Sequence, residues 1–114
     1  MKSDKPNWFV VVSKPRQEQI ALENLQRQGF ECFLPMAENP YQRRSKKHLK
    51  IIEPLFPRYL FLYAIADAQN LSPVRYTKGV LSMVRFGMEL AVISDSIIQA
   101  LKTKIVLDTG LIRI

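Results

Sequence analysis

Residues 59–64, Tyr-Leu-Phe-Leu-Tyr-Ala, are apolar at every position and alternate between aromatic and aliphatic side chains. Successive side chains of a strand point to opposite faces, so the rings lie on one face and the aliphatic groups on the other. Neither face is polar, which predicts a central strand of a sheet. Residues 8–12 are aromatic and β-branched throughout and predict a second buried strand beside the first.

Two helices are predicted from start and stop signals. Ser13 and Pro15 signal the start of the first helix, and Gly29 signals its end. Ser94 and Asp95 signal the start of the last helix. This last helix carries an apolar stripe at helical spacing that consists of Ile97, Ile98, Leu101 and Ile105.

Shorter elements are predicted in the remaining segments from apolar runs and turn residues. They are a strand over 30–34, a short helix over 68–71 capped by Asp67 and interrupted by Pro73, a loop over 74–79, a strand over 80–86, and its partner over 90–93 after a turn at Gly87.

This order of elements predicts an α/β (α+β) sandwich with a mainly antiparallel, four-stranded sheet. We expect the helices on one face of the sheet and an uncovered aromatic face on the other, which carries Tyr59, Phe61 and Phe86. The predicted boundaries are a flexible lead over 1–6, one domain over 7–107 and a tail over 108–114.

The formal net charge is +7, and the excess is concentrated between residues 41 and 50. This basic arm predicts either a β-hairpin or a solvated loop, and its charge favours a polyanionic partner or an acidic protein surface. Its cations are Arg43, Arg44, Lys46, Lys47 and Lys50.

Candidate catalytic chemistry is sparse. Cys32 is the only cysteine and His48 the only histidine, so an intramolecular disulfide and a thiolate metal site are excluded. His48 with Glu53 suggests a nuclease pair, but a histidine among lysines is typical of a basic patch. No glycine-rich phosphate loop is present. We expect no enzyme, no cofactor and no metal, and a cytoplasmic protein without a membrane anchor.

Two binding functions and one purely structural interpretation fit the aromatic face. Its rings could stack nucleotide bases, as in a sheet-surface RNA-binding domain, although the Gly-aromatic pattern of that motif is missing. The face and the adjoining Phe56-Pro57 edge could instead receive an apolar ridge of another protein. In the third interpretation the aromatic rings belong to an ordinary core.

Five motifs occur in order along the chain: WFVV at 8–11, LPM at 34–36, EPLFPRYLF at 53–61, TKGV at 77–80 and VRFG at 84–87. Together they resemble the N-terminal (NGN) domain of the NusG family of transcription elongation factors, closest to the RfaH-type antiterminators. The resemblance implies a bacterial, monomeric module that binds RNA polymerase and suppresses pausing and termination.

The resemblance also implies two contacts with the polymerase. The residues that correspond to the socket for the clamp helices of the β′ subunit are Phe56, Pro57, Tyr59, Phe61, Phe86 and Ile98. The residues that correspond to the contact with the gate loop of the β subunit are Asn70, Leu71, Ser72 and Pro73, among which only Ser72 has a hydroxyl group.

A third implied contact is with the single-stranded non-template DNA. The corresponding residues are Lys14, Arg27, Gln28, Thr77 and Lys78. The lysines suit phosphates, whereas Arg27 and Gln28 suit base edges. The basic arm, with Arg43, Arg44, Lys46 and Lys47, is expected to add phosphate contacts.

Family members usually continue through a linker into a KOW domain, which in the RfaH branch packs on the aromatic socket. We expect that no KOW domain follows residue 107, either because the chain is shortened or because it is a single-domain variant. In both cases we expect the socket to be open to the polymerase. Glu53 corresponds to an acid that holds the closed form in that branch. Nucleoid association during transcription is expected as well.

Overall fold

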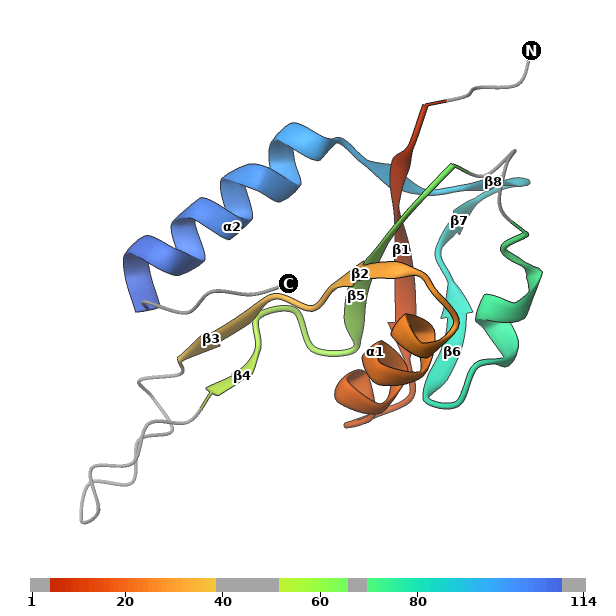
Figure 1. The fold of residues 1–114 in the computed structure, drawn as a ribbon, viewed down its shortest axis with the longest axis horizontal. Coiled ribbons are helices and arrows are strands. Elements are labelled where there is room, and N and C mark those ends of the chain that lie inside the picture. Colours follow the sequence, from red (N-terminus) through yellow and green to blue (C-terminus); the bar gives the residue numbers. More distant parts are fainter. Residues whose placement is uncertain (1–4, 39–51, 66–69, 110–114) are drawn as a thin grey trace.

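The computed structural model describes residues 5–38, 52–65 and 70–109, and the side chains of the last helix up to residue 105. The predicted α/β sandwich with an antiparallel sheet is confirmed (Figure 1). In chain order the elements are β1 (Asn7–Ser13), α1 (Glu18–Arg27), β2 (Glu31–Phe33), β3 (Met36–Glu38), β4 (Ile52–Pro54), β5 (Tyr59–Ala64), the 3-10 helix η2 (Ser72–Tyr76), β6 (Val80–Met83), β7 (Arg85–Phe86), β8 (Glu89–Leu90), β9 (Val92–Ile93) and α2 (Asp95–Thr109).

The main sheet has the strand order β2-β5-β1-β6, and β9 also pairs with β1 as a fifth strand. β1 and β5 are antiparallel neighbours, in a register that runs from Asn7 opposite Ala64 to Val12 opposite Tyr59. The two strands predicted to be central are therefore confirmed as neighbours. β3 with β4, and β7 with β8, form separate two-stranded sheets.

The aliphatic face of β5 packs against α1, as the alternation predicts. The core on this face is completed by Phe9 and Val11 of β1, which point to the same side. Its residues from β5 and α1 are Leu60, Leu62, Ala64, Ala21, Leu22 and Leu25.

Helix α2 packs over Phe61 on the aromatic face of β5, so the expectation of an uncovered face is wrong at this residue (Figure 1). Tyr59 and Phe86 are exposed, as expected.

Ile98 and Ile105 of α2 join Trp8, Phe33 and Phe61 in a second buried cluster. Positions three to four residues apart share one face of a helix, so Ile98, Leu101 and Ile105 pack against the rings of the sheet. Ile97, which was predicted as part of this stripe, is 54% exposed. The two helices thus lie on opposite faces.

The first helix begins later than predicted. Arg16 has a φ of +60°, which is not helical, and α1 begins at Glu18 instead of near Pro15. Gly29 follows the helix with a φ of +94°, as expected for a residue that ends a helix.

Two further boundaries differ from the predictions. Pro73 lies in the first turn of η2, where its missing N–H costs nothing, so part of the expected loop is helical. The predicted strand over 80–86 and its partner over 90–93 are both split. β6 pairs with β1 and β7 pairs with β8, whereas β9 turns away from the hairpin to pair with β1. The turn at Gly87 is confirmed, with a φ of +63°.

The basic arm over 41–50 lies outside the described residues, as do residues 68 and 69 of the predicted short helix. Asn70 and Leu71, the last two residues of that prediction, are described and are not helical. The strands that flank the arm, β3 and β4, pair antiparallel, with Met36 opposite Pro54 and Glu38 opposite Ile52.

Candidate functional site

The chain enters β5 through a tight turn, residues 56–59, which we call the entrance turn. The Tyr59 amide donates to the Phe56 carbonyl at 3.0 Å, and Arg58 adopts a φ of +74°. A positive φ is strained for a residue other than glycine and persists only where neighbours hold it.

Two residues of other elements hold the entrance turn. The buried carboxylate of Glu18 accepts a hydrogen bond from the Arg58 amide at 2.9 Å. Arg58 Nε donates to the Ser13 carbonyl at 3.2 Å, and the Ser13 amide donates to the Arg58 carbonyl at 2.8 Å. The turn is therefore fixed against the start of α1 and the end of β1.

The six residues that resemblance assigns to the clamp helices divide into two groups. Phe61 is only 7% exposed beneath α2, and Ile98, on the inner face of α2, is fully buried in the same cluster. Tyr59 is 43% exposed, and Phe56 and Pro57 are exposed beside it. The Phe56 and Phe61 rings form a T-shaped contact with a centroid distance of 6.5 Å. The entrance turn is thus an apolar surface supported by the core.

The sixth residue, Phe86, lies on the hairpin formed by β7 and β8 and is 77% exposed. Met88, across the Gly87 turn, is 93% exposed and was not among the predicted residues. The available signal was the sequence Phe-Gly-Met, because a hairpin turn flanked by large apolar residues departs from the usual polar turn.

Helix α2 is attached to the aromatic face by polar contacts as well as by its stripe. Trp8 Nε1 donates to Asp95 Oδ1 at 2.9 Å. This hydrogen bond, with a smaller contribution from Gln99, lowers the pKa of the exposed Asp95 carboxyl. Lys102 Nζ lies 5.2 Å from the centre of the Trp8 ring and 5.1 Å from that of Phe33, distances typical of cation–π contacts.

The segment assigned to the gate loop leads into η2. Asn70 Oδ1 accepts hydrogen bonds from the Ser72 amide at 3.0 Å and from Ser72 Oγ at 2.7 Å. Leu71 packs against the core, whereas Pro73 is exposed. The one hydroxyl of the motif is thus hydrogen-bonded within its own segment.

The residues assigned to DNA gather where the end of α1, the end of β1 and the turn between η2 and β6 meet. We call this the basic surface. Gln28 Nε2 donates to Thr77 Oγ1 at 2.7 Å, and the Lys14 amide donates to the Gly79 carbonyl at 2.8 Å. Arg27 and Lys78 are exposed on the same elements. The residues from the basic arm, Arg43, Arg44, Lys46 and Lys47, lie outside the described residues.

The buried groups of the described chain offer little redox or metal chemistry. Burial, with a smaller contribution from Glu31, raises the pKa of the Cys32 thiol to about 12, so the thiol is protonated at neutral pH. Among residues 5–38, 52–65 and 70–109 no three His, Cys, Asp or Glu side chains group as metal ligands. In the same segments no helix has the length and hydropathy needed to cross a membrane.

The family model described as "Transcription termination factor nusG" matches residues 6–102. The chain belongs to the NusG family. Membership in the NusG family supports a role in transcription termination or elongation and implies an interaction with RNA polymerase. It also supports the NGN-type domain that the sequence motifs indicate. The match spans the entrance turn, the basic surface and the first part of α2.

Proposed function

We propose that the chain is an RfaH-type transcription elongation and antitermination module. In this proposal the entrance turn and Phe86 bind the clamp helices of the β′ subunit of bacterial RNA polymerase, and the basic surface contacts the non-template DNA strand. The module thereby suppresses pausing and termination, as a monomer on the nucleoid in the bacterial cytoplasm. The observation that carries the proposal is an exposed, rigid aromatic surface in a chain of the NusG family.

The entrance turn has the properties of an interface anchor. Tyr59 and Phe56 expose large rings, and the hydrogen bonds from Arg58 to Glu18 and Ser13 hold their backbone. A side chain that is ordered before binding loses little conformational entropy in the complex. Buried aromatic anchors at interfaces are often worth about 2 kcal/mol or more when truncated.

Phe61 and Ile98 have a supporting role in this proposal. Phe61 supports the Phe56 ring through a T-shaped contact, and Ile98 packs in the same cluster as Phe61. A change at either residue therefore acts on the anchor through the core, and variants there are expected to affect folding as well as binding.

The basic surface suits a single DNA strand. Lys14 and Lys78 provide exposed charge for phosphates, and the amide of Gln28 is held in place by Thr77. An arginine such as Arg27 and an oriented glutamine can read base edges, whereas lysines act as point charges on the backbone.

The covering of the aromatic face by α2 counts against the alternative of a sheet-surface RNA-binding domain. Stacking by Tyr59, Phe61 and Tyr63 requires open rings, but Phe61 is buried under α2 and Tyr63 packs against the same cluster. A gel shift with RNA alone distinguishes the two functions: tight, sequence-selective RNA binding without polymerase favours the alternative.

The direct test replaces Tyr59 with alanine and measures affinity for core RNA polymerase free of nucleic acid. Tyr59→Ala is expected to fold and to weaken binding by about 2 kcal/mol, roughly thirtyfold, because an exposed ring is lost from the interface. Ile52→Ala, which truncates an equally exposed apolar residue of β4, is the control and should bind as the parent does. Unchanged affinity of Tyr59→Ala would refute the assignment.

A further inference from the structure

The last residue of η2 presents an exposed aromatic ring beside the basic surface. Tyr76 is 77% exposed and directly precedes Thr77 and Lys78, two of the residues assigned to DNA. It was not among the predicted site residues. Single exposed apolar side chains are common on protein surfaces, so the surroundings of Tyr76 decide whether its ring has a function.

The local periodicity of the chain turns Tyr76 outward together with two cations. A 3-10 helix has three residues per turn, so Val74 and Thr77, which are three positions apart, lie on one side of the segment. Both are buried, at 0% and 7% exposure. Arg75, Tyr76 and Lys78 are exposed. The ring therefore lies between two positively charged side chains along the chain.

The backbone that carries Tyr76 is held against α1. Thr77 Oγ1 donates to the Pro73 carbonyl at 3.0 Å and accepts a hydrogen bond from Gln28 Nε2 at 2.7 Å. The Thr77 amide donates to the Val74 carbonyl at 3.1 Å. Gln28 is the C-cap residue of α1 and belongs to the basic surface. The contacts that join two residues assigned to DNA thus also fix the position of the Tyr76 backbone.

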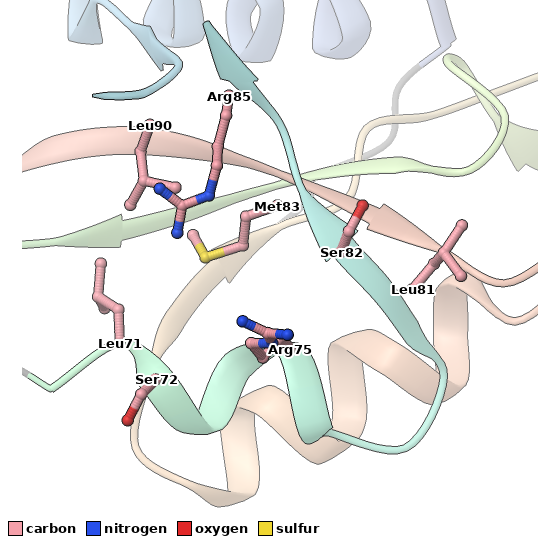
Figure 2. A pocket seen from close by; sticks show the side chains of 8 residues that line it. All are labelled: Leu71, Ser72, Arg75, Leu81, Ser82, Met83, Arg85 and Leu90. Carbon is pink, nitrogen blue, oxygen red and sulfur yellow. The ribbon is translucent and has the colours of Figure 1, made fainter. Parts of the chain in front are cut away.

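The Tyr76 ring is held on one face. The guanidinium carbon of Arg75 lies 5.1 Å from the centre of the ring, a distance typical of a cation–π contact. Arg75 also lines the hollow between η2, β6 and the β7–β8 hairpin, together with Arg85 of β7 (Figure 2). Because Tyr76 is 77% exposed, the other face of its ring is open to solvent. A ring that is held before binding loses little conformational entropy in a complex.

An open aromatic face between cations suits a nucleobase better than an apolar side chain of a protein. Every nucleobase has a flat π face that stacks on an aromatic ring. The cations on either side attract the phosphates that flank the base, whereas an apolar protein side chain gains nothing from them. Stacking on a protein ring requires a base that is unpaired, which a single strand provides.

We infer that Tyr76 stacks on an unpaired base of single-stranded DNA held at the basic surface, with Arg75 as a positioning residue that holds the ring. The inference rests on the proposed function, because the strand is the one that the basic surface contacts there. It adds a stacking contact to the contacts with phosphates and base edges. This contact carries no charge of its own, so its contribution to affinity does not depend on the release of counterions.

The test compares Tyr76→Leu and Tyr76→Phe with the parent in binding to single-stranded DNA, measured by fluorescence anisotropy. The oligonucleotide consists of thymidines around one 2-aminopurine, whose fluorescence falls when it stacks. Tyr76→Leu should bind about tenfold more weakly and quench the 2-aminopurine less, because a stacking ring is lost. Tyr76→Phe keeps the ring and should bind as the parent does. Leu81→Ala, which shortens an exposed side chain of β6, is the control and should also bind as the parent does.

An abasic oligonucleotide of the same length separates stacking from an effect on the fold. It has the same phosphates but no bases, so the parent and Tyr76→Leu should bind it equally. The two proteins should also show the same slope of log affinity against log salt concentration, because no charge is changed.

The outcomes distinguish the stacking contact from the DNA contact as a whole. Equal weakening of Tyr76→Leu on both oligonucleotides, no weakening on either, or weakening only on RNA of the same sequence overturns the inference. The proposed DNA contact survives these results if Lys78→Gln still weakens binding. Failure of the parent to bind either oligonucleotide overturns the inference and the proposed DNA contact together.

Discussion

Gly79 lies where the turn between η2 and β6 packs against Ala21 of α1. Its φ is +90°, and a Cβ atom built on it would lie 2.7 Å from the backbone nitrogen of Ala21 and 3.0 Å from its Cα. Backbone atoms of a packed helix cannot move aside as the end of a long side chain can. The missing side chain of Gly79 therefore sets how closely the turn that carries Lys78 approaches α1.

Gly79→Ala should lower the free energy of unfolding by about 2–3 kcal/mol, since overpacking and a left-handed backbone each add a cost. Gly29→Ala is the control, because Gly29 has a similar φ of +94° but nothing within 4 Å of its Cβ position, so only the backbone cost of about 1 kcal/mol applies. Urea unfolding of both variants gives the comparison. Equal losses of unfolding free energy in the two variants would mean that Gly79 is not tightly packed against Ala21.

At the scale of elements, local sequence patterns predicted the strands and the directions of their side chains. The alternation over 59–64 gives β5 and both its faces, because each side chain's direction follows from its neighbours in the strand. The face of the sheet that a helix covers cannot be predicted from local sequence, because an apolar helix stripe fits either face of a sheet whose two faces are both apolar. The bond between Trp8 and Asp95, which joins residues 87 positions apart, could not be predicted from spacing.

The hydrogen bond between Trp8 and Asp95 makes the packing of α2 on the sheet sensitive to acid. The pKa of Asp95 is lowered in the folded chain, chiefly by the indole N–H of Trp8, so its ionised form stabilises the fold. This stabilisation is complete above the pKa of the unfolded chain and is lost as pH falls through the lower folded pKa. Asp95→Asn keeps an acceptor oxygen but not the charge.

Parent and Asp95→Asn should therefore differ most in thermal stability near neutral pH, with the parent more stable. The difference should shrink between about pH 5 and pH 3 as the carboxyl is protonated. Because Trp8 is the only tryptophan, its fluorescence reports unfolding at the hydrogen bond between Trp8 and Asp95. A difference that is constant across this range would show that ionisation of Asp95 does not contribute.

At the scale of the whole molecule, the candidate site was predicted as a set of residues but not as a surface. Gln28 and Thr77, assigned together by resemblance, are hydrogen-bonded, whereas Phe61 lies under α2 instead of on an open face. The hollow that Arg75 of η2 and Arg85 of β7 both line could not be predicted, since η2 and the β7–β8 hairpin must both fold before these residues come together. Sites made from several elements depend on packing, which local patterns do not encode.

The net charge of +7 raises the question of whether single-stranded DNA is held by the overall field of the molecule or by the basic surface. Each phosphate neutralised at a defined contact changes the slope of log affinity against log salt concentration by about 0.7 for a single strand. Lys78→Gln should reduce the slope by about that amount when binding to an oligonucleotide is measured by fluorescence anisotropy. Lys104→Gln removes the same charge from α2, on the opposite face of the sheet, and should leave the slope unchanged. Equal reductions in the two variants would assign the affinity to the overall field and remove Lys78 from the DNA contact.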